Sequence, residues 1–433
     1  MKLAPIVAFV LVMYSSAILG QDLKPYANIP LGTLWSSYDE VPASGKTRRE
    51  YAPIDEMMVK FLVDNQLPGA TLAISKGSRL VYARGFGYSD IENELPMPAN
   101  AQMRLASISK PITAAAIMKL VDQGELTLET KVFDRFDFAA KGPIKDTRLL
   151  DITVLQLLRH TAGFDRNVSY DPMFIEREVA RAVGRKTPVE PDDIIKFMLG
   201  QKLDFAPGTK YAYSNYGYSV LGRVIEKVSG KGYEEYVQEE VLRPLGLRNM
   251  RVGYTLPEKK FELEPRYYMR DGGTVSSLFD PSAKVPHPYG RWSVQTMDAH
   301  GGWVASAIEM VKFASAFDKP KRCPILSKKA VEAIFFPPDL DLRQIEPGRG
   351  GTKRFYGCGW NMLVFGENKF NAYHGGLFSG TSNILVRRRD GFNWAVLFNC
   401  NQTPNKKKPS SAIDSLVHRA VDSVGRFKPI SPR

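Results

Sequence analysis

Hydrophobic periodicity near the start of the chain alternates between helix and strand. Residues 51–69 (YAPIDEMMVKFLVDNQLPG) carry apolar side chains at helical spacing and end in Pro-Gly, which predicts a helix. Residues 70–90 (ATLAISKGSRLVYARGFGYSD) contain two runs typical of strands, separated by the turn Lys76-Gly77-Ser78. A second helix is predicted within residues 104–126 (RLASISKPITAAAIMKLVDQGEL). This part of the chain therefore predicts strands with helices packed against them.

The pattern changes between residues 131 and 290, where helical segments alternate with loops rich in Pro and Gly. The helical segments include 152–164 (ITVLQLLRHTAGF) and 218–230 (YSVLGRVIEKVSG). Strand patterns then return, and an amphipathic helix is predicted near the end of the sequence. The predicted strands lie in 355–365, 370–388 and 393–400, and the predicted helix in 412–424.

This order of elements predicts an α+β fold. An antiparallel β-sheet flanked by helices is interrupted by an inserted, mostly helical lobe. We expect a single catalytic domain at 51–433, with a sheet lobe formed by 51–130 and 291–433 and a helical lobe at 131–290.

The first residues have the composition of an export signal. Lys2 precedes an unbroken apolar run at 3–13, and small residues follow up to Gly20. The run is too short for a membrane span, so residues 1–20 are interpreted as a signal peptide. Residues 21–50 contain prolines without periodicity and are predicted to form an extended N-terminal arm. The sequence therefore predicts a secreted or periplasmic protein.

Composition and charge exclude several classes of partner. The chain has 433 residues, of which 44% are hydrophobic and 24% charged, which is ordinary for a globular protein. The net charge of +13 arises from short, scattered clusters, such as 387–389 and 406–408, and not from a basic stripe interleaved with aromatic residues. No nucleic-acid partner is therefore expected. No later segment reaches the length of a transmembrane helix, so no stable membrane insertion is expected. The oligomeric state stays open.

Cysteines and histidines show no metal-binding pattern. Cys323, Cys358 and Cys400 lack ligand spacing and allow either one disulfide or none. Packing as small buried apolar residues is the favoured interpretation. The five histidines also lack zinc spacing, so neither a metal nor another cofactor is expected.

A serine and a lysine stand three residues apart where a loop becomes a helix. Ser107 and Lys110 would share one helical face, next to backbone N–H groups that have no partner within the helix. The small and apolar residues that follow predict a buried helix, and burial would lower the pKa of the lysine so that it can accept a proton. This is the arrangement that a serine nucleophile requires. Taken alone, the pair is better explained by a helix cap and a solvated lysine.

Two further motifs give the pair a context. Tyr213-Ser214-Asn215 lies in a loop before a predicted helix, and His374-Gly375-Gly376 lies in a predicted strand. Glycines in a strand allow another backbone to approach closely, although a turn or bulge would also explain them. Tyr213 could equally be a packing residue of the aromatic segment YAYSNYGY, and Asn215 a turn residue.

Together, the motifs S-x-x-K (107–110), Y-x-N (213–215) and H-x-G (374–376) resemble a known family. It comprises the class C serine β-lactamases and the related D-alanyl-D-alanine carboxypeptidases, esterases and D-aminopeptidases. The flanking segments LLRHTAGF, LRPLGLRNM and GGWVASAIEMVKF are also similar to that family, and the likeness covers most of residues 51–400. The resemblance implies a β-lactamase/transpeptidase-like fold.

The resemblance also implies a role for each matching residue. Ser107 would attack the substrate carbonyl and form an acyl-enzyme. Lys110 and Tyr213 would take up its proton and return it to the leaving group, with Tyr213 phenolate-like; which of the two is the general base stays open. Asn215, His374 and Gly376 would bind the substrate. The backbone N–H groups of Ser107 and Leu377 would form the oxyanion hole.

The third motif departs from the pattern of many penicillin-recognising members, in which a lysine begins it. Here His374 takes that position. A histidine is mostly neutral at pH 7, so it is a poorer anchor for a carboxylate than a lysine would be. We therefore expect an exported serine hydrolase that cleaves small-molecule ester, amide or peptide substrates. Two alternatives stay open: a β-lactamase or peptidoglycan D,D-carboxypeptidase, and a non-catalytic binding or sensor module.

Overall fold

The computed structural model of the chain describes residues 31–138, 144–366 and 369–430. The predicted signal peptide at 1–20 lies outside the described residues, as does the beginning of the predicted arm, 21–30. The rest of the arm forms two short 3₁₀ turns and the short strand β1.

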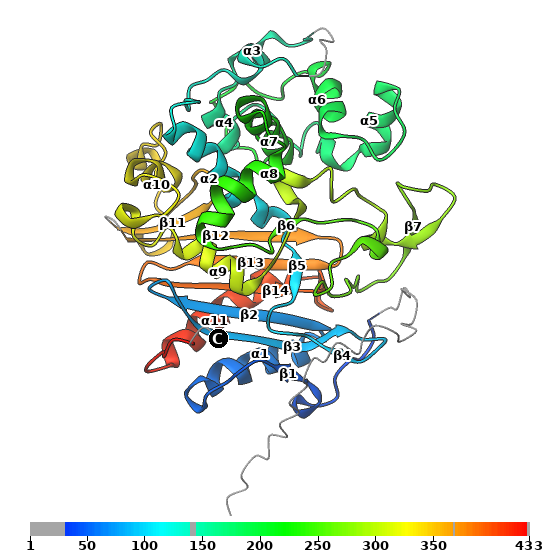
Figure 1. Cartoon of the computed structure of the whole chain (residues 1–433), viewed down its shortest axis with the longest axis vertical. Helices are drawn as coiled ribbons and strands as arrows, with labels where there is room; N and C mark the ends of the chain where they lie inside the picture. The colour runs from blue at the N-terminus through cyan, green and yellow to red at the C-terminus, as the bar shows by residue number, and fades with distance from the viewer. Residues whose placement is uncertain (1–30, 139–143, 367–368, 431–433) are drawn as a thin grey trace, which may run out of the picture.

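The described part of the chain is built on a nine-stranded antiparallel sheet (Figure 1). Its strand order is β1-β3-β2-β14-β13-β12-β11-β10, and β4 pairs with β3 beside this path. The strands of this sheet are β1 (Ala43–Ser44), β2 (Gly69–Lys76), β3 (Arg79–Asp90), β4 (Leu95–Pro96), β10 (Lys353–Tyr356), β11 (Asn361–Gly366), β12 (Lys369–Phe378), β13 (Thr381–Arg387) and β14 (Phe392–Phe398).

Strands from the two ends of the sequence meet in the middle of this sheet. β2 pairs with β14 in a register that runs from Ala70↔Phe398 to Lys76↔Phe392. Figure 1 shows the blue N-terminal strands beside the orange C-terminal ones. The chain between them leaves the sheet and forms most of the helices. The antiparallel sheet with an inserted set of helices is the predicted fold class, and it is confirmed.

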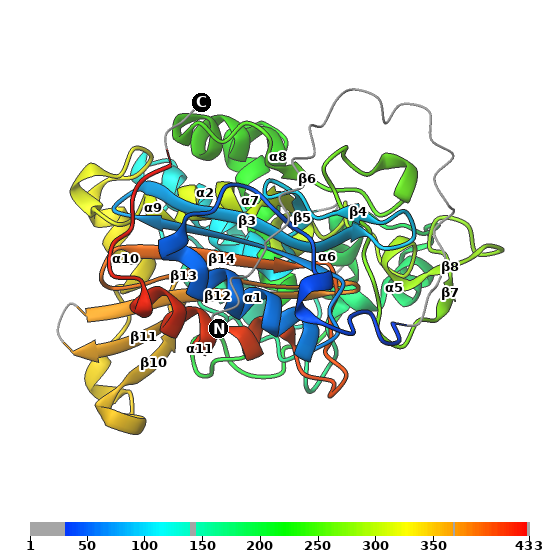
Figure 2. The ribbon, with the colours of Figure 1, turned by 90° about the horizontal axis from the view of Figure 1, so that it is seen from below.

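Two helices cover one face of the sheet. α1 (Ala52–Asp64) and α11 (Pro409–Ser423) contact each other and lie across β3, β13 and β14 (Figure 2). Their apolar side chains enclose one hydrophobic core with the sheet, which includes Ile54, Trp394 and Ile413, each fully buried. Both helices were predicted from their hydrophobic periodicity.

The other face of the sheet is covered by the remaining helices. α9 (Ala307–Ser315) packs directly on β2 and β14, and α2 (Ser109–Asp122) packs against α7 (Asn215–Ser229) and α10 (Lys328–Phe335). One continuous core joins these helices to the sheet. The other helices are α3 (Val132–Arg135), α4 (Val154–Leu158), α5 (Glu176–Val183), α6 (Pro191–Leu199) and α8 (Tyr233–Val237).

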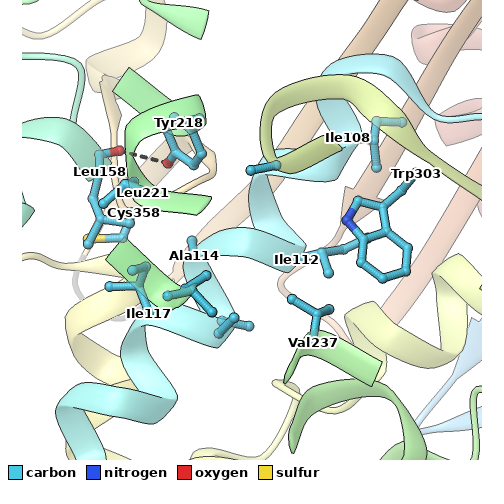
Figure 3. Close-up of a cluster of buried hydrophobic side chains, with 14 of the residues drawn as sticks. Ile108, Ile112, Ala114, Ile117, Leu158, Tyr218, Leu221, Val237, Trp303 and Cys358 are labelled. Carbon is cyan, nitrogen blue, oxygen red and sulfur yellow. Dashed lines mark hydrogen bonds between the residues drawn. The ribbon is translucent and has the colours of Figure 1, made fainter. Parts of the chain in front are cut away.

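α2 lies at the centre of this core and is buried on nearly every side. Figure 3 shows Ile112, Ala114 and Ile117 of α2 pointing into the apolar cluster, between Trp303 and Leu221. This burial follows from the small and apolar residues after Lys110. It places the first residues of α2 inside the molecule.

Several short strands do not follow from the sequence pattern. β5 (Gln102–Arg104), β9 (Trp303–Ser306) and β6 (Arg251–Val252) form a three-stranded sheet, and β7 (Thr274–Ser276) pairs with β8 (Lys284–Pro286). Segments of two to four residues are too short to show an alternating pattern. The expected strand at 370–388 is likewise divided into β12 and β13 by a tight turn after Phe378.

A buried arginine ties β5 to its surroundings. Arg104 donates hydrogen bonds to the backbone oxygens of Pro288 and Tyr254 and lies 3.4 Å from the Glu264 carboxylate. Its own backbone oxygen accepts a hydrogen bond from Asn383 of β13. Buried charges are tolerated only when they are paired and hydrogen-bonded, as here. The chain is thereby fixed immediately before Ser107.

All three cysteines are free thiols, so the alternative without a disulfide holds in this structure. Cys358 and Cys400 are buried, whereas Cys323 is partly exposed. None of the helices in the described ranges is both long and apolar enough to cross a membrane. Within those same ranges, no cluster of three or more Cys, His, Asp or Glu side chains is arranged to hold a metal ion.

Candidate active site

Three segments that are remote in the sequence meet at the sheet-side end of α2. A 3₁₀ turn, η3 (Ala106–Ile108), carries Ser107 and leads directly into α2, whose second residue is Lys110. Tyr213 precedes the N-cap of α7, Ser214, whose hydroxyl accepts a hydrogen bond from the Gly217 N–H. Strand β12, which carries His374–Leu377, packs against η3.

Lys110 connects the first two of these segments. Its Nζ atom lies 3.2 Å from Ser107 Oγ and donates a 2.7 Å hydrogen bond to Asn215 Oδ1. A further hydrogen bond of 2.8 Å goes to the backbone oxygen of His300. The amine is therefore fixed within proton-transfer distance of the serine hydroxyl.

Burial changes the ionisation of this lysine. Its side chain is 0% exposed, and the loss of solvation holds the pKa of Lys110 well below the ordinary value for lysine. The positive charge of Arg166 lowers this pKa further, and the negative charge of Asp171 opposes the shift. The neutral amine that a proton acceptor requires is thus favoured, as the sequence led us to expect.

Tyr213 contacts the same hydroxyl. Its phenol interacts with Ser107, which acts to lower the pKa of Tyr213, and Lys110 Nζ lies 4.9 Å from the centre of the Tyr213 ring. Burial raises the pKa of Tyr213 above the ordinary value for tyrosine, and it outweighs the opposing effects of Ser107 and Arg166. The expectation of a phenolate-like tyrosine is therefore wrong, because desolvation of the phenolate exceeds the stabilisation by nearby cations.

An aspartate that no motif indicated completes the environment of Asn215. The Asn215 side-chain amide donates a 2.7 Å hydrogen bond to Asp171 Oδ2 while its oxygen accepts from Lys110. Asp171 also caps the short 3₁₀ turn η5 (Pro172–Phe174) by accepting from the Met173 N–H. An Asp before a Pro signals such a cap, but it does not signal contact with α7, 44 residues away.

Strand β12 presents a partly free edge to Ser107. Its pairing with β11 ends at Tyr373, so among the described strands only β13 pairs with residues 374–378. A Cβ atom on Gly376 would lie 2.1 Å from the backbone oxygen of Leu105, so glycine is required where the strand meets η3. The neighbouring Leu377 side chain is 43% exposed. The predicted oxyanion hole, formed by the N–H groups of Ser107 and Leu377, stays a prediction that this close approach supports.

His374 is turned into the protein. Its side chain is buried, Nδ1 donates to the Gly375 backbone oxygen at 2.7 Å, and Nε2 lies 3.0 Å from the Tyr356 hydroxyl. Burial, reinforced by the charge of Lys110, lowers the pKa of His374 to about 3, so the ring is neutral. Both ring nitrogens are engaged, so a contact with substrate would come from the backbone of His374, and its assignment as a binding residue stays a prediction.

The two histidines that could suggest a Ser–His–Asp triad have other contacts. His160 Nδ1 accepts a hydrogen bond from the Ser214 N–H, and its ring lies 4.3 Å from that of Tyr213, measured between centroids. His300 contributes its backbone oxygen to Lys110. Burial lowers the pKa of both imidazoles well below the ordinary value. His160 therefore positions the segment that carries Tyr213.

Chemically, this arrangement can activate a hydroxyl. A serine lies beside a desolvated amine that can accept its proton and a protonated tyrosine that can donate one. Both groups are held by buried side chains, and an open strand edge runs past the hydroxyl. These are the parts needed for acyl transfer through a serine.

Comparison with known families agrees with this geometry. The family model described as Beta-lactamase matches residues 54–417, which is most of the chain. The chain belongs to the Beta-lactamase family. It is accordingly an enzyme of the serine hydrolase type. The resemblance drawn from the three motifs is confirmed.

Among curated proteins, the chain is similar to penicillin-binding protein 4* of Bacillus subtilis, with 26% identity over 75% of this chain and 66% of that protein. It is also similar to a probable fimbrial assembly protein, FimD, of Dichelobacter nodosus, with 26% identity over 62% of each chain. The alignments thus span less than two thirds of these relatives.

Solved structures show the same fold. The octameric penicillin-binding protein homologue from Pyrococcus abyssi aligns with a TM-score of 0.64 at 26% identity, and the alignment covers 86% of this chain and 76% of the homologue's chain. D-amino acid amidase from Ochrobactrum anthropi aligns with a TM-score of 0.63 at 20% identity, over 87% of this chain and 99% of the amidase. The predicted β-lactamase/transpeptidase-like fold is confirmed.

Proposed function

We propose that this protein is an exported hydrolase that cleaves ester or amide bonds through an acyl-enzyme on Ser107. The observation that carries the proposal is the 3.2 Å contact between Ser107 Oγ and a fully buried Lys110 amine. If Ser107 were only a helix cap and Lys110 a solvated lysine, the amine would be exposed to water. Instead, it contacts oxygen atoms of α7 and of the turn that contains His300.

Lys110 is the proposed general base. Its lowered pKa makes the neutral amine available, whereas the raised pKa of Tyr213 keeps the phenol protonated. Lys110 would take the proton as Ser107 attacks the carbonyl carbon and forms the covalent bond to the acyl group. Tyr213 would donate its proton to the leaving group and regain one from Lys110, which balances the acylation step. Water would release the acyl group by the reverse sequence.

The proposed substrates are small esters, amides or peptides. A neutral, internally bonded His374 offers no positive charge for the carboxylate of a β-lactam, which argues for substrates recognised in another way. The name of one similar protein, a D-amino acid amidase, justifies testing D-amino acid amides as well.

Export is the second part of the proposal. It is supported by the lysine, apolar run and small residues within 1–20. Expression of the full sequence, followed by N-terminal sequencing of the exported material, tests it. A mature N-terminus between residues 15 and 25 is expected, and full-length protein retained in the cytoplasm would contradict it.

The hydrolase proposal is tested with p-nitrophenyl acetate, a chromogenic cephalosporin and a fluorophosphonate probe. We expect ester cleavage and probe labelling, both of which disappear in Ser107→Ala with a loss in kcat of at least about 10³-fold. Ser411→Ala, an exposed serine on α11, is the matched control and keeps both.

Other results would favour the alternatives. Rapid turnover of the cephalosporin without ester cleavage would indicate a β-lactamase. A folded wild-type protein that neither reacts with the probe nor cleaves any of these compounds would indicate a binding or sensor module.

A further inference from the structure

Arg166 lies beside Tyr213 in the candidate active site. It belongs to the loop between α4 and η5, and its side chain is exposed. The central carbon of its guanidinium is 4.9 Å from the centre of the Tyr213 ring, and Lys110 Nζ is 4.9 Å from that same centre. The arginine thus stacks on the same tyrosine ring that faces Lys110 and interacts with Ser107.

The guanidinium acts on the whole site. Its charge influences the ionisation of Lys110, Tyr213, Asp171 and His160, and of the exposed Tyr211. Because an arginine stays protonated throughout the physiological pH range, this positive charge is permanent.

The donors of Arg166 are available. Within 31–138, 144–366 and 369–430, no residue forms a hydrogen bond or ion pair with its guanidinium, and stacking on Tyr213 is its specific contact. The adjacent carboxylates are engaged elsewhere: Asp165 pairs with Lys210 at 2.7 Å, and Asp171 accepts from Asn215 at 2.7 Å. A guanidinium has five N–H donors in a planar fork that matches a carboxylate.

The other basic groups of the site cannot offer a positive charge with free donors to a carboxylate. His374 is neutral and bonded through both ring nitrogens. Lys110 is buried, and its amine is already engaged by Ser107, Asn215 and His300. The position in the strand motif that is a lysine in many penicillin-recognising members is therefore uncharged here, while Arg166 places a positive charge beside Tyr213.

We propose that Arg166 is the specificity-determining residue of this hydrolase and binds a carboxylate carried by the substrate. The inference rests on the proposed function and narrows its substrate class to anionic esters, amides or peptides. Bidentate contact with the guanidinium fixes the carboxylate beside the Tyr213 ring, and the exposed Tyr211 offers an apolar surface next to it.

Two pairs of esters test this inference. The first pair is 4-nitrophenyl hydrogen glutarate and its methyl ester, which differ in charge on the acyl side. The second pair is 4-carboxyphenyl acetate and 4-carbamoylphenyl acetate, which differ in charge on the leaving group. The readout is the ratio of kcat/KM for the anionic ester to that for its neutral partner.

In at least one pair, Arg166→Gln is expected to lower this ratio by about 10- to 100-fold, mainly through KM, as for the loss of a charged hydrogen bond. Arg166→Lys restores the charge without the fork and should recover part of the ratio. The control is Arg389→Gln. It removes another exposed arginine, whose guanidinium lies 4.5 Å from the Phe365 ring, at the other end of β13 from the turn beside the site.

The affected pair identifies the half of the substrate that carries the carboxylate. A ratio that is unchanged in Arg166→Gln for both pairs, or that falls equally in Arg389→Gln, overturns the inference. It leaves the proposed function intact if the wild type cleaves the neutral esters. If the folded wild type cleaves none of the four esters and is not labelled by the fluorophosphonate, the proposed function itself fails.

Discussion

Burial makes the charged form of Lys110 unfavourable and lowers its pKa. Two nearby side chains of opposite charge shift this pKa further, in opposite directions. Asp171 reaches it through Asn215 and raises its pKa, whereas Arg166 lowers it across the Tyr213 ring. His160 and His374 lie on neighbouring elements of the site but are neutral, so they add no further charge near pH 7. The balance between Asp171 and Arg166 should therefore be visible in the pH dependence of activity.

We expect the acid limb of kcat/KM for a neutral ester to report the ionisation of Lys110. A base acts when it is neutral, so activity falls as the pH drops through the pKa of Lys110, and this limb lies well below pH 10. Asp171→Asn removes the charge that raises this pKa and should move the limb to lower pH. Arg166→Gln should move it to higher pH.

Full pH–rate profiles of the three proteins provide the measurement, with Arg389→Gln as the control whose limb should stay in place. Shifts in the same direction for Asp171→Asn and Arg166→Gln would show that the limb belongs to a different group.

The contact between Ser107 and Lys110 could be predicted because their relation is local. Residues three apart at a helix start share a face whatever surrounds them. The ionisation of Tyr213 could not be predicted in the same way, since its pKa depends on burial beneath segments that are distant in sequence. Asp171 and Arg166 carry no motif, and their position at the site depends on the packing of α7 against α2 and η5.

At the scale of elements, the site depends on how closely β12 approaches η3. Gly376→Ala would place a Cβ 2.1 Å from the Leu105 oxygen, and that oxygen belongs to backbone fixed by β5. Either β12 or the Ser107 segment must move. We expect a loss of about 1 to 3 kcal/mol in the free energy of unfolding, together with most of the activity.

Gly375→Ala is the matched control for this prediction. A Cβ on Gly375 would meet its nearest neighbour, the Asn383 backbone oxygen, at an ordinary 3.8 Å. Urea unfolding of both variants, combined with fluorophosphonate labelling, separates the two positions. Equal stability of Gly376→Ala and the wild type would contradict the close contact between β12 and the turn η3.

Single helices and strands can be predicted from the sequence better than the elements that each of them packs against. The helix around Met58 and the hairpin at Gly77 follow from periodicity and turn residues. The pairing of β2 with β14 does not, because partners such as Ala70 and Phe398 are separated by most of the chain. This pairing depends on packing against both faces of the sheet, with α1 and α11 on one face and α9 on the other.

Over the whole molecule, two hydrophobic cores share one sheet. The core beneath α1 and α11 contains Ile413, and the core on the other face contains Leu221 of α7, both fully buried. Strands β2 and β14 contribute alternate side chains to each: Ala73 and Ala395 face the second core, whereas Leu72 and Val396 face the first. Loss of either core therefore removes support from the same strands.

This sharing predicts that the two cores unfold together. Ile413→Ala and Leu221→Ala should each destabilise the protein by about 2 to 5 kcal/mol and shift one common transition. Urea unfolding followed by circular dichroism and by tryptophan fluorescence provides two probes, since Trp394 lies in the first core and Trp303 in the second. If Leu221→Ala moves one of two resolved transitions and Ile413→Ala moves the other, the two cores unfold separately, and the alternating strands do not couple them.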